Sequence, residues 1–498
     1  ASLGQPQIVI LGPAPICMPN RQAFLTMRMN SVNGSHSNGL PLDKGNTTFV
    51  ELMRAVGYHT ALIGKSHLQT MTDAPAQMQM ETHPAEELAP PAGLENARNR
   101  EDDISAEGYQ QERRSRWLND PALTPQTPYY GFDDVIFASA HSEVADGHHR
   151  RHLDAIDPAI SQGVGRQNST DVFEGSRQLY ASTLDPEQYP THFVGQSTKN
   201  WLKAHAEEQP DAPFFLWCSF PDPHHPWTPP AKYYHMYDPA DVELPDSFYE
   251  SPRNQTESLR WAHAAFQRGA RPPRVPFMAA EAEARKILAV TYGMITFIDE
   301  QIGEIVAQLE ALGQAENTVI VFTSDHGDYM AHHGLFLKGG THYQTLIKVP
   351  FIWCDADDRY NRGLTKGLAS YVDIGRTVLQ RAGLAPFHGH QGRSLLPFFA
   401  GEEERHRDRV LVEHVVSAER LGFPVWSQIR TVVTERYRLS ISNVRDEGEL
   451  YDLQEDPGEI VNLWESEKHV GVKAEMLFAL AQEMADLADR SRVPALLA

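Results

Sequence analysis

Near the start of the sequence, a cysteine, a proline and an arginine are spaced two residues apart, as Cys17, Pro19 and Arg21. They stand at the beginning of a stretch, residues 21–29, that we expect to be helical. Taken alone, this C-x-P-x-R pattern is as compatible with a buried cysteine that packs as a small hydrophobic residue as with a functional group. The chain has three cysteines in 498 residues, so the pattern is uncommon by chance. Its meaning depends on the polar motifs that follow.

A second polar motif, Asp325-His326-Gly327, directly follows the apolar run Thr318–Thr323. Side chains at the carboxyl end of a parallel strand point into the crevice where ligands bind. Asp325 and His326 therefore offer an oxygen and an imidazole to a divalent cation there. An isolated Asp-His-Gly sequence is more often a polar turn. The position of this motif after a predicted strand, with Lys338 twelve residues after His326, favours a metal-binding site over a polar turn.

Cationic residues stand in three further motifs. Lys65 and His67 come directly after one predicted strand, and His224 comes soon after another. Lys338 is followed by two glycines, so the backbone can approach a ligand closely, and its ammonium is a mobile point charge. Each of these residues by itself is also explained as an exposed loop residue. His225, next to His224, is expected to be a neighbour and not a participant.

Together these motifs resemble those of the type I sulfatases in the alkaline phosphatase superfamily. The matching patterns, in family order, are C-x-P-x-R at Cys17, G-K-x-H-L at Gly64, P-H-x-P at Pro223, D-H-G at Asp325 and K-G with Y and V-P from Lys338 to Pro350. The resemblance spans roughly residues 12–70 and 190–355. It continues near the C-terminus in Gly448–Leu453 and in Asp456–Glu459.

The resemblance implies that a formylglycine-generating enzyme oxidises Cys17 to formylglycine during maturation. The hydrated aldehyde would then be the nucleophile. The resemblance also implies that Asp325, His326 and the modified Cys17 hold one divalent cation. Hard oxygen ligands make Ca²⁺ the expected ion, and the imidazole leaves Mn²⁺ open.

By the same resemblance, the chain hydrolyses a sulfate monoester. One hydroxyl of the hydrate attacks sulfur, and the alcohol leaves with help from His224 and Lys338. The second hydroxyl, deprotonated with help from His67, then expels sulfate and re-forms the aldehyde, which a serine with its single hydroxyl cannot do. Arg21 is expected to steady the nucleophile and the cation, and Lys65 the sulfate.

A further cluster of histidines comprises His141 and Gly147-His148-His149. It resembles a Gly-His motif of some sulfatases and of phosphonate monoester hydrolases, and His148 is therefore predicted to line the substrate pocket. Since the chain has 23 histidines, a surface role outside the site is the plainer alternative.

The sequence departs from the family pattern at its start. Sulfatases carry an Asp-Asp or Asp-Gln pair on a strand that precedes the cysteine, whereas no acidic residue precedes Cys17 here. Either an N-terminal strand has been lost, or the protein is not a competent metalloenzyme. Two alternatives therefore stay open. The first, a formylglycine-dependent phosphonate monoester hydrolase or phosphodiesterase, is favoured by Asp-His in place of Asp-Asn. The second, a non-catalytic sulfatase-like binding protein, is favoured by the missing pair.

The elements that must position these residues alternate between strands and helices. Strands are predicted at Gln7–Leu11, His59–Ile63, Pro213–Ser219, Thr318–Thr323 and Val349–Trp353, and helices at 21–29, 47–56, 196–206, 280–312 and 373–382. This order predicts an α/β fold of the alkaline phosphatase type, with a large, mostly parallel sheet between helices. The third and fourth strands are expected to be fully buried. Residues 70–130, 150–190 and 235–280 are expected to be irregular excursions.

The character of the sequence changes after Gly401. Residues 402–408 form a charged linker, and short strands are expected around Gln428–Thr434, Tyr437–Ser442 and Glu449–Leu453. An amphipathic helix follows, with Met476, Leu480, Met484 and Leu487 on its buried face. Because the length exceeds a single core of about 250–300 residues, we predict a catalytic domain at 1–401 and a small α+β subdomain at 402–498.

Composition limits the partners. The formal net charge of -22 argues against a nucleic-acid or membrane-surface binder, so an anionic substrate needs a local cationic pocket. The cysteines have no disulfide or zinc-finger spacing. No run approaches the ~18 apolar residues of a membrane span, and no signal peptide is visible. We expect a cytoplasmic enzyme whose substrate is a small-molecule or saccharide sulfate ester. A clipped N-terminus would remove a targeting segment, and homo-oligomer formation is left open.

Overall fold

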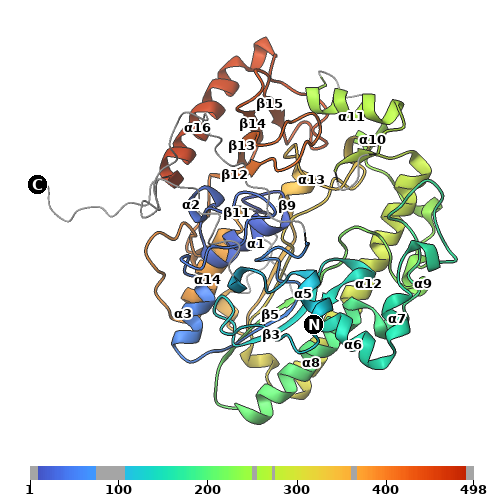
Figure 1. Ribbon diagram of the computed structural model, residues 1–498. Helices are drawn as coiled ribbons and strands as arrows, with labels where there is room; N and C mark the ends of the chain where they lie inside the picture. Colours follow the sequence, from blue (N-terminus) through green and yellow to red (C-terminus); the bar gives the residue numbers. More distant parts are fainter. Residues whose placement is uncertain (1–8, 74–106, 250–254, 272–274, 361–366, 489–498) are drawn as a thin grey trace, which may run out of the picture.

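The computed structural model describes residues 9–73, 107–249, 255–271, 275–360 and 367–488. In Figure 1, helices surround the strands of the larger part of the chain, and the C-terminal helix α16 (Val470–Ala488) lies beside an antiparallel sheet at the top. The architecture is therefore mixed α/β with a smaller C-terminal sheet, as the sequence predicts.

The sheet that carries most of the polar motifs has the strand order β4-β3-β2-β5. Its strands are β2 (His59–Gly64), β3 (Asp134–Ser139), β4 (Asp146–Gly147) and β5 (Phe214–Ser219). Strand β2 pairs in parallel with β3 and with β5, so that Ile63 lies opposite both Ile136 and Cys218. Parallel strands end at the same edge of a sheet. The segments that follow these three strands therefore meet at one edge.

Helices cover both faces of this sheet. One face packs on α8 (Pro190–Glu208) and α12 (Glu281–Ala311), through a core that includes Val194, Leu202 and Leu309. The other face packs on α1 (Cys17–Thr26), α3 (Phe49–Ala55) and α14 (Val372–Arg381). The long helix predicted over 280–312 is confirmed almost to the residue.

The remaining strands of this part form two small sheets. Strand β7 (Ile320–Thr323) pairs antiparallel with β10 (Phe351–Cys354). Strand β1 (Val9–Leu11) lies between β11 (Leu368–Ser370), which is parallel to it, and β9 (Lys348–Val349), which is antiparallel. The strand predicted at Val349–Trp353 is thus two strands.

The prediction that Pro213–Ser219 and Thr318–Thr323 are fully buried is wrong. Most side chains of β5 and β7 are partly exposed, and Phe322 is 38% exposed. The reason is that β5 pairs only with β2, and β7 only with β10, among the described residues. Yet both strands belong to one layer, because Leu216 and Ile320 enter the core beside α8 and α12, whereas Trp217 and Val321 enter the core on the opposite face.

The C-terminal part is a four-stranded antiparallel sheet covered by α16. Its strands, in spatial order, are β12 (Arg409–Val415), β13 (Gln428–Thr434), β14 (Tyr437–Ser442) and β15 (Glu449–Asp452). The sequence missed β12 and placed the others correctly. Met476, Leu480 and Leu487 are buried as predicted, but Met484 is 39% exposed, because it lies at the margin of the buried face. The domain boundary after 401 stays a prediction.

Short helices occupy segments that were expected to be irregular. They include α6 (His148–Ile156) and α7 (Pro158–Gln162) in 150–190, and α11 (Glu257–Gln267) in 235–280. The predicted excursion at 70–130 is described at 70–73 and from 107 onward, where α5 (Arg114–Asn119) lies. The other short elements are α2 (Asn30–Asn33), α9 (Ala231–Tyr234), α10 (Asp246–Tyr249), β6 (Phe277–Met278), β8 (Leu335–Phe336), α13 (Gln344–Ile347) and α15 (Leu396–Phe399).

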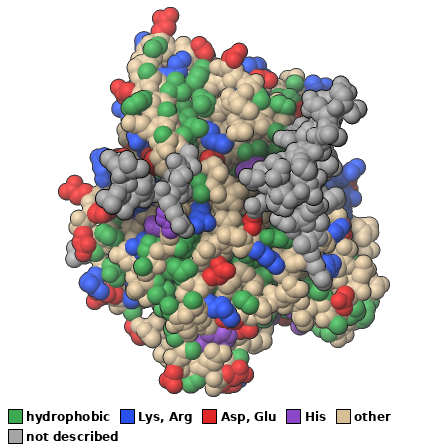
Figure 2. All heavy atoms as spheres, turned by 60° about the vertical axis from the view of Figure 1, so that its left-hand side comes forward, with side chains coloured by type: hydrophobic (Ala, Val, Ile, Leu, Met, Phe, Trp, Pro, Cys, Tyr) green, Lys and Arg blue, Asp and Glu red, His purple; other side chains and the backbone are tan. Residues whose placement is uncertain are grey.

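The surface agrees with the composition. On the face shown in Figure 2, acidic and basic side chains are interspersed, with hydrophobic side chains between them. Among the described helices, none combines the length and the apolar character that crossing a bilayer requires.

Asp373 anchors the N-terminus of α14 to the segment before β12. Its buried carboxylate accepts hydrogen bonds from Arg407 Nε (2.7 Å), from His406 Nε2 (3.0 Å) and from the backbone N–H groups of Ser370 and Arg393. Burial alone would raise the pKa of Asp373, but Arg407 and His406 hold it well below its usual value. The carboxylate is therefore charged, and it neutralises a buried guanidinium.

We predict that Asp373→Asn lowers the free energy of unfolding by about 3–5 kcal/mol, because Arg407 then stays buried without its counter-charge. Urea denaturation followed by tryptophan fluorescence measures this. Asp408→Asn is the matched control, because that side chain is 83% exposed, and its effect should stay within about 0.5 kcal/mol. Equal effects of the two substitutions would contradict the prediction.

Candidate active site

Cys17 is the first residue of α1 and is almost completely buried, with 1% of its surface exposed. Ile16 before it is extended, and Pro19 lies in the first turn of the helix, where no backbone N–H is needed. The Cys17 Sγ atom lies 3.0 Å from His326 Nε2, 3.0 Å from Lys338 Nζ and 3.7 Å from Lys65 Nζ. Three motifs that are far apart in the sequence therefore meet at this one sulfur.

The surroundings of Cys17 favour a negative charge. Burial by itself would raise the pKa of the thiol, but the ammonium groups of Lys338 and Lys65 and the imidazole of His326 lower it well below its ordinary value. The first turn of α1 adds the partial positive charge of its unbonded N–H groups. An anion formed at this position is stabilised.

Asp325 follows β7 and is held by Arg21. The Arg21 Nε donates to Asp325 Oδ2 at 2.8 Å, and another nitrogen of the guanidinium, Nη1, donates to Lys65 O at 2.7 Å and to Ser219 Oγ at 3.0 Å. Burial would raise the pKa of Asp325, but His326 and Arg21 hold it far below its usual value. Arg21 therefore ties the ends of β2, β5 and β7 together. Its hydrogen bond to a charged side chain goes to the predicted metal ligand Asp325, and its charge also acts on Cys17.

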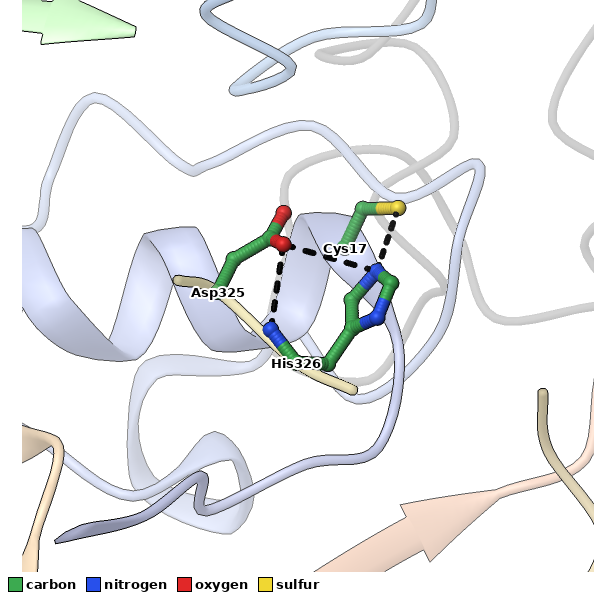
Figure 3. A group of neighbouring side chains, drawn as sticks. All are labelled: Cys17, Asp325 and His326. Carbon is green, nitrogen blue, oxygen red and sulfur yellow. Dashed lines mark hydrogen bonds and ion pairs between the residues drawn. The ribbon is translucent and has the colours of Figure 1, made fainter. Parts of the chain in front are cut away.

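His326 is oriented as a metal ligand would be. Its Nδ1 lies 2.7 Å from the carbonyl of Gly327, which places the ring proton on Nδ1 and turns the Nε2 lone pair toward Cys17. Histidines that bind metals usually donate their other ring N–H in this way. Figure 3 shows Cys17, Asp325 and His326 turned toward one another.

These three residues are the group among the described residues whose ligand atoms converge closely enough for a metal, all within 4.8 Å of one another. One carboxylate, one imidazole and a cysteine that becomes an oxygen ligand on conversion to formylglycine fit a divalent cation chemically. Ca²⁺ takes about 6–8 oxygen ligands, so this set is only part of a complete shell.

Lys338 and His224 form a closely coupled pair. Lys338 Nζ lies 2.5 Å from His224 Nε2 and 2.9 Å from His326 Nε2. Burial and the neighbouring Lys338 ammonium lower the pKa of His224 to about 3. His224 is therefore neutral near pH 7 and accepts a hydrogen bond from Lys338. The two side chains can share one proton beside Cys17.

Lys65 and His67 leave β2 through a tightly held turn. Both are buried, and burial lowers the pKa of each. The backbone N–H groups of His67, Leu68 and Gln69 all donate to the Glu112 carboxylate, at 2.7–2.9 Å. Glu112 therefore holds the turn in place. The sequence did not point to it, because it lies within the segment expected to be an irregular excursion.

His148 is not brought to this site. Its Nδ1 accepts from the backbone N–H of Phe137, and its ring packs on Trp117 with centroids 4.8 Å apart. His141 lies at the site instead, because its ring stacks on that of His224. One signal could have found it: His141 follows shortly after the end of β3, as the other motif residues follow their strands.

Comparisons with known proteins agree with this geometry. A model of the sulfatase family matches residues 9–384, and a model described as the C-terminal part of N-sulphoglucosamine sulphohydrolase matches residues 331–486. An arylsulfatase of Clostridium perfringens is 27% identical over 466 residues, which cover 91% of this chain and 82% of the relative.

Two solved structures are similar over nearly the whole chain. The structure of BT4656 in complex with its substrate D-glucosamine-2-N,6-O-disulfate superposes with a TM-score of 0.67 at 17% identity, covering 98% of this chain and 92% of that one. A phosphonate monoester hydrolase of Silicibacter pomeroyi superposes with a TM-score of 0.71 at 20% identity, covering 97% and 89%. At such identities they show the fold alone, and they confirm the predicted alkaline-phosphatase-like architecture.

Proposed function

The chain belongs to the sulfatase family of sulfuric ester hydrolases, and on that premise we propose that it cleaves a sulfate monoester of a small molecule or saccharide. The nucleophile is a formylglycine that a formylglycine-generating enzyme makes from Cys17. The observation that carries the proposal is the convergence of Lys65, His326 and Lys338 on Cys17 Sγ within 3.7 Å. Four sequence motifs, those of Cys17, Lys65, His326 and Lys338, therefore contribute side chains to one site.

The side chains divide the work by position. Lys65 and Lys338 are 2% and 6% exposed, so their ammonium groups neutralise sulfate oxygens in surroundings from which water is largely excluded. The proton shared by Lys338 and His224 is available to the oxygen of the leaving group. His67 also interacts with Cys17, and we assign it to the second hydroxyl of the hydrate.

A divalent cation belongs to this proposal. Asp325, His326 and the modified Cys17 would hold it, and when bound it supplies positive charge that stabilises the nucleophile and the sulfate. We propose Ca²⁺ because formylglycine and carboxylates are hard oxygen ligands, with Mn²⁺ as the alternative that the imidazole allows.

We further propose that a strand carrying carboxylates completes the ligand set. Strands β5 and β7 belong to one layer but are not paired with each other. Arg21 joins their ends, since it bonds Ser219 of β5 and Asp325 beyond β7. A strand between them would satisfy both open edges and end beside Asp325. Metal analysis of protein expressed from the full open reading frame tests this: a bound stoichiometric cation supports it, and failure to bind any metal supports the non-catalytic alternative.

The ratio of two hydrolytic activities decides between the sulfatase and the phosphonate hydrolase. We predict that kcat/KM for 4-nitrophenyl sulfate exceeds that for 4-nitrophenyl phenylphosphonate by at least about tenfold, or ~1.4 kcal/mol in transition-state stabilisation. The leaving group is the same in both, so the ratio reports the central atom and its charge.

Each other outcome has a meaning. A reversed ratio would replace the sulfatase by the phosphonate monoester hydrolase. Sulfate binding without turnover of either ester would favour the non-catalytic binding protein. The cytoplasmic location is a further prediction of the sequence, which localisation of the expressed protein tests. The oligomeric state, which the sequence leaves open, is measured by size-exclusion chromatography.

A further inference from the structure

The His224 ring packs against two other imidazole rings, one stacked on it and one tilted. The His141 ring lies face to face on it, with centroids 3.6 Å apart and planes 10° from parallel. The His225 ring lies 4.0 Å from it on another side, at 31°. The His141 and His225 rings are 6.5 Å from each other, so one face of His224 is covered by the parallel His141 ring and the tilted His225 ring packs beside it.

The edges of His224 are held as well. Its Nδ1 lies 2.5 Å from the carbonyl oxygen of His225, and its Nε2 lies 2.5 Å from Lys338 Nζ. The last torsion of a histidine side chain is broad and is not held by a steep rotamer well. A rotation about that torsion would turn Nε2 away from Lys338, so the face-to-face contact with His141, together with the two contacts at the ring nitrogens, sets where the reactive nitrogen points.

His141 comes from a different strand, and its loop is attached to the loop of His224. Ser142 Oγ lies 2.5 Å from Pro226 O and 3.1 Å from His224 O, so its one hydroxyl proton bonds to the loop of His224. Ala140 and Ser142, on either side of His141, have φ of 70° and 49°. Such left-handed conformations cost free energy in residues other than glycine and persist where the surroundings require them. The backbone is thus bent in a way that presents the His141 ring to His224.

The His141 ring contacts His224 with the flat face of its imidazole. Its Nδ1 is buried and has no hydrogen-bond partner among the described residues. Of its ring contacts with site residues, the parallel contact with His224 at 3.6 Å is much shorter than the contact with His67 at 6.2 Å. We propose that His141 is a positioning residue: it fixes the plane of the His224 imidazole, so that Nε2 stays directed at Lys338 and at the leaving-group oxygen. This rests on the sulfatase activity proposed above.

The kinetic test uses His141→Ala, which removes the ring, and His141→Phe, which keeps a flat ring without its nitrogens. With an alkyl sulfate, whose leaving group needs a proton, we expect His141→Ala to lower kcat by about 100-fold and to change KM by less than about twofold. With 4-nitrophenyl sulfate, whose leaving group departs more easily without a proton, kcat should fall by less than about tenfold. His141→Phe should recover most of the lost kcat.

A matched control and a second readout keep the test decisive. His152→Ala removes an exposed histidine of α6, and the thermal midpoints of all variants show whether they fold. Crystal structures of the wild type and of both His141 variants give the plane of the His224 ring without any need for activity. They therefore separate a failure of this inference from a failure of the proposed function.

The expected structures show the His224 ring unchanged in His141→Phe and rotated or disordered in His141→Ala. The inference is overturned if His141→Ala leaves the His224 plane and the kcat for alkyl sulfate as in the wild type. It is equally overturned if His141→Phe is as slow as His141→Ala, because the nitrogens of the ring and not its face would then matter.

Discussion

Replacing Cys17 by alanine is expected to lower kcat for sulfate esters by on the order of 10⁴- to 10⁶-fold, because it removes the only atom on which the site's charges converge as a nucleophile. Lys338 and His326 each lie 3.0 Å from Cys17 Sγ. The methyl group of alanine cannot take the place of that atom, because it cannot act as a nucleophile. Initial rates with 4-nitrophenyl sulfate measure the loss.

Cys218→Ala is the matched control. Cys218 lies in β5, accepts a hydrogen bond from Thr198, and has a thiol pKa raised by burial to about 11. A thiol of this kind is a packing residue, so the control should keep nearly full activity. If Cys17→Ala were as active as Cys218→Ala, Cys17 would not be the nucleophile.

Cys17→Ser separates the two halves of the reaction. A serine has one hydroxyl, so it can attack sulfur once but has no second hydroxyl with which to expel sulfate. We therefore expect at most one equivalent of phenol per enzyme, followed by arrest, with sulfate attached to the peptide that contains residue 17. Continuous turnover by this variant would rule out the geminal diol as the reason for the modification.

The state of Cys17 in the natural protein can be read by mass. Residues 1–20 contain no lysine or arginine, so trypsin releases Cys17 in a peptide that ends at Arg21. An aldehyde in place of the thiol, trapped by a hydrazide reagent, establishes the nucleophile. An unmodified thiol that reacts with an alkylating reagent, in protein from a host with the maturing enzyme, would remove it.

Replacing Lys338 by methionine is expected to lower kcat for 4-nitrophenyl sulfate by about 10²- to 10³-fold, the usual effect of removing one buried donor to a developing negative charge. Methionine keeps the length of the side chain but not its charge or its proton. Because Lys338 also contacts His224 at 2.5 Å, the loss should be larger for an alkyl sulfate, whose leaving group depends more on protonation.

Lys348→Met tests whether the effect is local. Lys348 lies ten residues away in β9 and is exposed, so its replacement should change kcat by less than about twofold. Equal sensitivity of Lys338→Met to good and poor leaving groups would show that Lys338 neutralises sulfate but does not take part in protonation.

The sequence by itself determined the chemistry of this protein. Cys17, Lys65, His224, Asp325 and Lys338 each stand in a short motif, and most of these motifs follow a continuous apolar run. Parallel strands bring the residues after them to one edge of a sheet. This rule applies to β2 and β5, and the resemblance of the motifs to those of the sulfatases predicted that the other residues join them; the structure brings Lys65, His326 and Lys338 together around Cys17 Sγ.

Only the tertiary structure decided which neighbouring side chains share the site. His148 and His141 are seven residues apart and chemically identical, but α6 turns His148 onto Trp117, whereas the turn after β3 lays His141 on His224. Glu112, which holds the turn of His67 through three backbone N–H groups, lies in a segment without periodicity. Such contacts join residues far apart in the chain, so they produce no pattern of spacing that could be recognised in the sequence.

The exposure of β5 and β7 shows the same limit. Their apolar, β-branched and aromatic sequences predict strands, and strands they are. Whether a strand is central or at an edge depends on which neighbour pairs with it, and a sequence specifies its own side chains but not the partner beside it. The sequence of each segment determined that β5 and β7 would be strands, and the pairing of backbone N–H and C=O groups in three dimensions decided that, among the described residues, β5 pairs only with β2 and β7 only with β10.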